Sequence, residues 1–125
     1  RVLGFVERNT MARGRVVFMG CNPRHHTLGI TTQPGPGRLL HLMLEVATLD
    51  DVGLALDRAH RLDVSMMHTL GKHTNDRMVS FYVYSPEGYA IEVGCDGLRV
   101  EVERPSYEIT AGAYWGHRFT PPPQR

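Results

Sequence analysis

Two residues of this sequence, a histidine and a glutamate, each interrupt a strongly apolar segment. His41 stands within 39–46 (LLHLMLEV), and Glu92 stands within 89–95 (YAIEVGC). Burying a carboxylate among apolar side chains is costly unless a cation or several hydrogen-bond donors compensate. A metal ion bound by the imidazole and the carboxylate would provide that compensation. We therefore expect His41 and Glu92 to be metal ligands.

One imidazole and one carboxylate make up two thirds of the ligand set that leaves open positions on a non-haem Fe(II). Zinc also fits these ligand types, whereas calcium does not suit a site that contains histidine. A lone strand histidine is more often a hydrogen-bonded residue at the edge of the core, so that interpretation stays open. The spacing does not choose among the candidate third ligands, which are His25, His26, His68 and His73.

Two further polar side chains lie close to these segments in the sequence. The stretch 71–76 (GKHTND) predicts a turn that carries His73, with a solvated hairpin loop as the alternative. In 78–84 (MVSFYVY) we expect Tyr82 to point away from the face that carries Phe81. Tyr82 then either packs with a wetted hydroxyl or donates a hydrogen bond to a bound ligand.

Short apolar segments separated by turn residues predict the strands that position these side chains. The glycine and proline residues of 34–37 (PGPG) form a connector, and 85–88 (SPEG) form a turn. From residue 39 onward the predicted order is strand, helix, strand, strand, strand. The predicted strands are 15–19, 26–30, 39–46, 66–70, 78–84 and 89–95.

The predicted helix follows the strand that carries His41. Thr48 and Asp51 fit a capping box at its start, and we expect it to end near Asp63. An apolar stripe with helical spacing should pack on a sheet. The stripe consists of Leu49, Val52, Leu56 and Ala59, flanked by Ala55 and Leu62.

Length and composition exclude several classes of protein. A chain of 125 residues with 42% hydrophobic content suits one domain, and a net charge of +1 disfavours nucleic acid or an acidic membrane as partner. No apolar run approaches the roughly 20 residues that span a bilayer, so we expect a cytoplasmic protein with no membrane partner. Cys21 and Cys95 should be free thiols. The chain begins at Arg1 in mid-pattern, so we interpret it as a piece of a longer protein.

Several motifs in register resemble one family, the type I extradiol ring-cleavage dioxygenases of the vicinal oxygen chelate superfamily. The resemblance covers essentially residues 2–119 and extends to 2,3-dihydroxybiphenyl 1,2-dioxygenases and the enzymes that cleave catecholic secosteroids. Ser85 is a minor departure, because threonine is more usual there. The motifs are CNPRHHTL at 21–28, LLHLMLEVATLDDVG at 39–53, GKH at 71–73, FY at 81–82, SPEG at 85–88, Glu92, and YWGHRF at 114–119.

The resemblance implies an α+β fold. A complete βαβββ module of the vicinal oxygen chelate or glyoxalase-like type would span 38–96. The closing strands of a truncated second module would precede it at 1–33. A C-terminal arm and a disordered tail, PPPQR, would follow at 97–125, with 97–114 covering the fold or lying at its edge.

The resemblance also implies an activity, which is Fe(II)-dependent extradiol cleavage of a bicyclic or polycyclic catechol such as 2,3-dihydroxybiphenyl. Both atoms of the co-substrate O₂ enter the product. His41 and Glu92 would bind Fe(II), with Mn(II) as the alternative metal, in an enzyme that is a large homo-oligomer. Biphenyl, naphthalene and secosteroid catechols all remain open as substrates.

The resemblance assigns roles to individual side chains. His26 would be the acid/base residue beside O₂, and His73 and Tyr82 would donate hydrogen bonds to substrate oxygens. Asn75 and Asp76 would orient the acid/base residue or contact the substrate. We expect His25 to face away from the site, because adjacent strand residues point to opposite faces. The expected substrate-binding residues are His26, His41, Asn75, Asp76 and Tyr82.

The resemblance also implies that one metal ligand is missing. The first metal histidine of the family lies on a strand that would precede Arg1, so we expect the 125 residues alone to bind iron weakly and to show little ring cleavage. Two alternatives remain. The first is a protein of the same fold that binds an aromatic ligand or a metal without turnover. The second is a zinc hydrolase or isomerase that uses His41 and Glu92 with another histidine.

Overall fold

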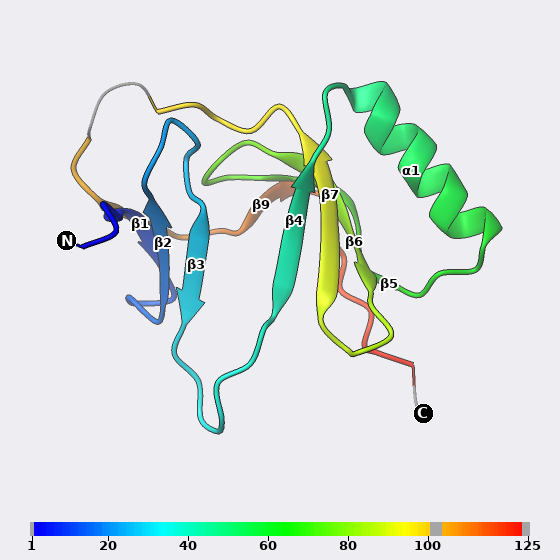
Figure 1. Ribbon diagram of the computed structural model, residues 1–125, viewed down its shortest axis with the longest axis horizontal. Helices are drawn as coiled ribbons and strands as arrows, with labels where there is room; N and C mark the ends of the chain where they lie inside the picture. The colour runs from blue at the N-terminus through cyan, green and yellow to red at the C-terminus, as the bar shows by residue number, and fades with distance from the viewer. Residues whose placement is uncertain (1, 101–103, 124–125) are drawn as a thin grey trace.

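The computed structural model describes residues 2–100 and 104–123, which form two β-sheets and one α-helix (Figure 1). The first sheet has the strand order β3-β2-β1-β8 and consists of β1 (Val6–Met11), β2 (Val16–Gly20), β3 (Leu28–Thr31) and β8 (Tyr107–Ile109). The second has the order β4-β7-β6-β5-β9 and consists of β4 (His41–Glu45), β5 (Met66–His73), β6 (Val79–Tyr84), β7 (Ala90–Cys95) and β9 (Ala113–Trp115).

The second sheet confirms the order predicted from the sequence. After β4 the chain forms α1 (Leu49–Arg61) and returns as β5, β6 and β7, and β7 pairs with β4 in parallel. A parallel pair needs such a crossover, because a tight turn cannot connect its strands. The helix covers the face of this sheet that points away from the first sheet (Figure 1). The opposite face is therefore the one that can carry a site.

The predicted capping box starts the helix. The Thr48 hydroxyl oxygen accepts a hydrogen bond from the Asp51 backbone N–H at 3.1 Å, and the Asp51 carboxylate accepts one from the Thr48 backbone N–H at 3.0 Å. The helix ends at Arg61, two residues before the expected position, with Leu62 as its C-cap. Asp63 follows with φ +53°, a left-handed conformation that cannot continue the helix.

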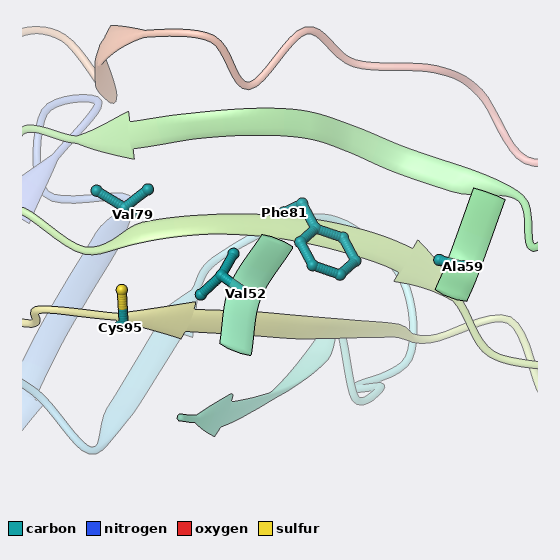
Figure 2. Packing of buried hydrophobic residues seen from close by; sticks show 5 residues of the cluster. All are labelled: Val52, Ala59, Val79, Phe81 and Cys95. Atoms are coloured by element: carbon teal, nitrogen blue, oxygen red, sulfur yellow. The ribbon is translucent and has the colours of Figure 1, made fainter. Parts of the chain in front are cut away.

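The hydrophobic core lies between α1 and the sheet. Val52 and Ala59 of the helix are buried against side chains of β6 and β7 (Figure 2), which confirms the centre of the predicted stripe. Its ends do not pack in this way, because Leu49 is 54% exposed and Leu62 is 66% exposed. The buried cluster consists of Val52, Ala59, Val79, Phe81 and Cys95, with Ala55 and Leu56 packed against it.

The strand β4 lies at the edge of its sheet, where among the described residues it pairs only with β7. Its leucine face is consequently half open, with Leu42 47% exposed and Leu44 56% exposed. The helix does not reach these side chains, because it contacts β6 and β7. The site face of the same strand carries His41.

The C-terminal segment reaches an edge of both sheets, as predicted for 97–114. β8 pairs with β1 in parallel, and β9 pairs with β5 in antiparallel fashion. Residues 121–123 have no regular secondary structure. The predictions for 101–103 and for the last two residues of the tail lie outside the described residues. The division into 1–33, 38–96 and 97–125 stays a prediction. Within the described ranges, no helix is long and apolar enough to cross a membrane.

Candidate metal centre and active site

His41 and Glu92 converge on the face of the second sheet that the helix leaves open. His41 begins β4, and Glu92 lies on the neighbouring strand β7, where Met43 is its direct partner. The His41 Nε2 atom is 3.6 Å from Glu92 Oε2, and Glu92 is only 5% exposed. The structure thus brings together the imidazole and the buried carboxylate that the sequence singled out.

The Glu92 carboxylate is held in its charged form. Burial raises its pKa, but hydrogen bonds from His73 and Ser80 outweigh burial and lower the pKa below its usual value. Ser80 Oγ donates to Glu92 Oε1 at 2.6 Å, and His73 Nε2 lies 3.4 Å from the same oxygen. The second oxygen, Oε2, faces His41 and remains available as a ligand.

The geometry of this pair fits one divalent metal ion. Bonds from a metal to histidine nitrogen or carboxylate oxygen are about 2.0–2.2 Å long, so one ion can bind two atoms up to ~4 Å apart. Burial lowers the pKa of His41 despite the neighbouring Glu92, which favours the neutral imidazole that binds metals. Within residues 2–100 and 104–123, no group of three or more His, Cys, Asp or Glu side chains is arranged to hold a metal. The assignment of His41 and Glu92 as metal ligands stays a prediction.

His73 is the last residue of β5, so its predicted position in a turn is wrong. Strand β5 continues through 71–73 because it pairs with β6 on one side and with β9 on the other. The His73 Nδ1 atom is 3.1 Å from the Gly112 carbonyl oxygen, and Nε2 is 2.8 Å from the Tyr82 hydroxyl. A carbonyl only accepts, so Nδ1 carries a hydrogen; in the charged ring Nε2 carries one too, and it can be donated to the Tyr82 hydroxyl oxygen and to Glu92 Oε1.

The Glu92 carboxylate raises the pKa of both His73 and Tyr82, which favours a charged imidazole and a neutral hydroxyl. Burial disfavours a charge on His73, but the hydrogen bond to Glu92 and the charge of that carboxylate outweigh burial and raise its pKa. Burial and the Glu92 charge both raise the pKa of Tyr82, so its hydroxyl keeps its proton. Tyr82 also lies edge-on to His41, with ring centroids 5.5 Å apart. A protonated hydroxyl thus lies beside His41 and Glu92, and the role of Tyr82 in substrate binding stays a prediction.

The C-terminal segment contributes His117, which stacks on His73 with ring centroids 4.0 Å apart and an interplanar angle of 20°. A Cβ atom on Gly71 would lie 2.5 Å from the His117 backbone nitrogen, so only glycine permits this crossing over β5. Gly116, with φ +71°, lets the chain turn there. Burial and the neighbouring His73 lower the pKa of His117 to about 4. His117 lies in the YWGHRF motif of the resemblance, but the sequence analysis gave it no role.

His68 helps to hold the segment around His117 against β5. Its Nδ1–H donates to the His117 carbonyl oxygen at 3.1 Å, and its ring lies edge-on to Tyr82 with centroids 5.1 Å apart. Thr69 and Arg118 add two hydrogen bonds between the same segments, of 3.2 Å and 3.0 Å. His68 was one of the open candidates for a third metal ligand, but in the structure it supports the wall of the site.

His26 lies on the first sheet's side of the site, in the loop before β3. Its Nδ1 atom is 3.8 Å from Asp76 Oδ2 and 3.0 Å from His25 Nδ1, and its ring lies edge-on to Phe18. The prediction that His25 faces away from the site rested on the alternation of a strand over 26–30 and stays a prediction. β3 begins only at Leu28, so the loop allows both imidazoles to turn toward each other. Burial lowers the pKa of His26 despite nearby carboxylates.

Asn75 and Asp76 lie in the turn between β5 and β6, and both are buried. Asp76 Oδ1 accepts the Met78 backbone N–H at 3.0 Å, which leaves Oδ2 directed toward His26. Asn75 Oδ1 has no hydrogen-bond partner among the described protein atoms. A buried acceptor of this kind is ready to bind a ligand or a water molecule. The roles predicted for Asn75 and Asp76 stay predictions.

Comparisons with known proteins give the class of this chain. Residues 1–93 match the sequence profile of the Glyoxalase/Bleomycin resistance protein/Dioxygenase superfamily, and the chain belongs to that family.

Within this family, the chain is similar to proteins that are named as dioxygenases. An iron-dependent extradiol dioxygenase of Rhodococcus jostii is 53% identical over 104 residues, which cover 82% of this chain and 35% of the relative. A biphenyl-2,3-diol 1,2-dioxygenase of Metapseudomonas furukawaii is 47% identical over 82% of this chain and 34% of its own length. The chain thus spans about a third of these relatives.

Solved structures agree with the sequence comparison. The crystal structure of BphC, a halotolerant catechol dioxygenase, superposes with a TM-score of 0.84 at 40% identity, over 94% of this chain and 41% of that one. The 2,2',3-trihydroxybiphenyl 1,2-dioxygenase of Sphingomonas wittichii superposes with a TM-score of 0.88 at 32% identity, over 95% of this chain and 44% of that one. The vicinal oxygen chelate fold predicted from the sequence is therefore confirmed.

Proposed function

We propose that this chain carries the His41–Glu92 side of the metal centre of an extradiol dioxygenase, an oxidoreductase that cleaves a 2,3-dihydroxybiphenyl-like catechol with O₂. The observation that carries the proposal is the 3.6 Å approach of His41 Nε2 to the buried Glu92 Oε2. The names of the relatives, which are extradiol and biphenyl-2,3-diol dioxygenases, support the same reaction class.

The bound metal would supply the open positions at which a catechol and O₂ meet, and Fe(II) is the metal we propose, with Mn(II) as the alternative. Glu92 and His41 would hold it through an anionic oxygen and a neutral nitrogen. His26, whose lowered pKa keeps it neutral, is a base that can take a proton from a catechol hydroxyl and return it later. Tyr82 would donate its hydroxyl hydrogen to a substrate oxygen, and His73 would hold the Tyr82 ring in position.

The proposal extends to the rest of the predicted enzyme. The name of the Rhodococcus relative supports iron. We propose that the protein is cytoplasmic and that it forms a homo-oligomer. The oligomer is supported by the half-exposed Leu42 and Leu44 on the open edge of β4, since they offer apolar surface that a further protein layer would cover. Asn75, with its unpartnered buried oxygen, and Asp76 would contact the substrate or orient His26.

A second candidate function has its own support. The described residues hold no group of three or more metal-ligating side chains. Two ligands alone bind a metal more weakly than three, so the same group of side chains would suit a protein that binds an aromatic ligand or a metal without turnover. The polar atoms of Asn75, Tyr82 and His26 would then recognise the ligand.

Oxygen consumption by the purified chain separates these functions. The chain and its Glu92→Gln variant are loaded anaerobically with Fe(II), and O₂ uptake is recorded after 2,3-dihydroxybiphenyl is added. We expect weak uptake that needs both iron and the catechol and that falls to the free-iron background in the variant. Equal uptake by both proteins would refute the dioxygenase proposal. Conversion of the substrate with Zn(II) in place of Fe(II) and without O₂ uptake would indicate zinc chemistry.

A further inference from the structure

His25 is buried beside the site, but none of the steps proposed above uses it. Only 5% of the residue is exposed, and its backbone N–H donates to the Leu98 carbonyl at 3.0 Å. Arg24 forms a β-bridge with Arg99, and a Cβ atom on Gly20 would lie 3.0 Å from the His25 carbonyl oxygen. The backbone around His25 is therefore fixed from both sides, and its ring has a defined position.

The His25 ring makes its closest polar contact with His26. The two Nδ1 atoms are 3.0 Å apart, and the rings meet edge to face with centroids 5.3 Å apart. A nitrogen pair at this distance holds one hydrogen between a donor and an acceptor. Asp76 Oδ2, at 3.8 Å from the same His26 nitrogen, lies beyond hydrogen-bond distance. His25 is thus the direct hydrogen-bond partner of His26 Nδ1.

The charges around the pair decide which ring accepts. Burial, the neighbouring His26 and the Arg8 guanidinium outweigh Asp76 and lower the pKa of His25 to about 4, so His25 is neutral near pH 7. When His26 takes up a proton it has hydrogens on both nitrogens and must donate from Nδ1. A neutral His25 can accept that hydrogen, and a hydrogen bond from an imidazolium is stronger than one between neutral rings.

We infer that His25 is a positioning residue for His26, accepting the His26 Nδ1–H at its own Nδ1 and so leaving His26 Nε2 as the basic nitrogen. The inference deepens the proposed function, on which the role of His26 as base rests. In this arrangement His26 already has the tautomer in which Nε2 has a free electron pair. No ring rotation is needed between proton uptake and proton return, and the His25 acceptor stays in place in both states.

Four ionisable groups also act on His26, so a change at His25 must be separated from their effects. Asp76 and Glu92 raise the pKa of His26, whereas His41 and His73 lower it. The Asp76 carboxylate, 3.8 Å from His26 Nδ1, also favours a hydrogen on that nitrogen through its charge. A variant of Asp76 is therefore needed to separate this charge effect from the hydrogen bond to His25.

The test is ¹⁵N NMR of the histidine rings in the 125-residue chain without metal, in which one-bond and long-range ¹H–¹⁵N couplings identify the tautomer. We expect His26 to carry its hydrogen on Nδ1 above its pKa. In His25→Phe, which keeps a ring of similar shape, we expect the His26 hydrogen to move to Nε2 and the His26 pKa to fall by about one pH unit. His25→Asn keeps an acceptor close to the Nδ1 position and should restore the Nδ1–H tautomer.

Asp76→Asn is the matched control. It removes a charge that raises the His26 pKa, so the pKa should fall while the tautomer stays Nδ1–H. An Nε2–H tautomer in the unmodified chain, or an unchanged tautomer in His25→Phe, would overturn the inference. If His25→Phe does not fold, the unmodified chain and His25→Asn decide, because both must show Nδ1–H. The NMR result does not depend on O₂ uptake, so failure of the proposed function and failure of this inference are distinguishable.

Discussion

Replacing Gly71 by alanine tests how the C-terminal segment is seated over the site. The added Cβ would lie 2.5 Å from the His117 backbone nitrogen and 2.6 Å from its ring carbon Cγ. A side-chain rotation cannot relieve the backbone contact. The Thr69 backbone N–H donates to the Arg118 carbonyl, and the Arg118 backbone N–H donates to the Thr69 hydroxyl, so both bonds resist separation of the segments. Overpacking of this kind typically costs about 1–3 kcal/mol, and we expect Gly71→Ala to lose stability at the upper end of that range.

A second glycine provides the control for this experiment. Gly53 lies in α1, and a methyl group added there would meet no other atom within 4 Å, so Gly53→Ala should gain roughly 0.5–1 kcal/mol from better helix propensity. Urea unfolding of the three proteins at one pH, followed by circular dichroism, gives both free energies. The same chemical change should thus have opposite effects at the two positions. A Gly71→Ala variant that unfolds at the same urea concentration as the unmodified chain would refute the close crossing at His117.

Three further predictions concern local interactions. Ser80→Ala removes a donor to Glu92 and should raise the Glu92 pKa, seen in a ¹³C carboxylate titration, and cost about 1–3 kcal/mol in urea unfolding. Folding lowers the pKa of His25 from 6.5 to about 4, so between pH 8 and pH 5 the unfolded chain takes up a proton at His25 that the folded chain does not. This residue should therefore make the free energy of unfolding about 2 kcal/mol smaller at pH 5 than at pH 8. A free energy of unfolding that rises on acidification would contradict this. Thr48→Ala removes the helix cap and should cost about 1 kcal/mol, and a loss below a few tenths would show that the cap contributes little.

The elements that carry His41 and Glu92 could be predicted from local sequence patterns. Alternation along a strand fixes which side chains share a face, so His41 and Glu92 could be assigned to site faces without coordinates. The capping residues Thr48 and Asp51 likewise identified the start of the helix, because their hydrogen bonds are local. The family resemblance then related these residues to a reaction class.

Contacts between distant segments were not predictable in this way. His73 was assigned to a turn because 71–76 is polar, but β9 extends β5 through it. His117 and His25 reach the site from irregular segments, in which no periodicity indicates the direction of a side chain. The exposure of Leu44 depends on β4 lying at a sheet edge, which strand order decides and local sequence does not.

The most direct test of the central claim locates the metal that His41 and Glu92 are proposed to hold. Paramagnetic Mn(II) is titrated into the ¹⁵N-labelled chain and into Glu92→Gln, and the loss of NMR signal intensity is mapped onto the sequence. We predict that signals of residues around His41 and Glu92 broaden first and that the variant requires far more metal for the same effect. Broadening centred elsewhere, or equal in both proteins, would contradict the proposed metal centre.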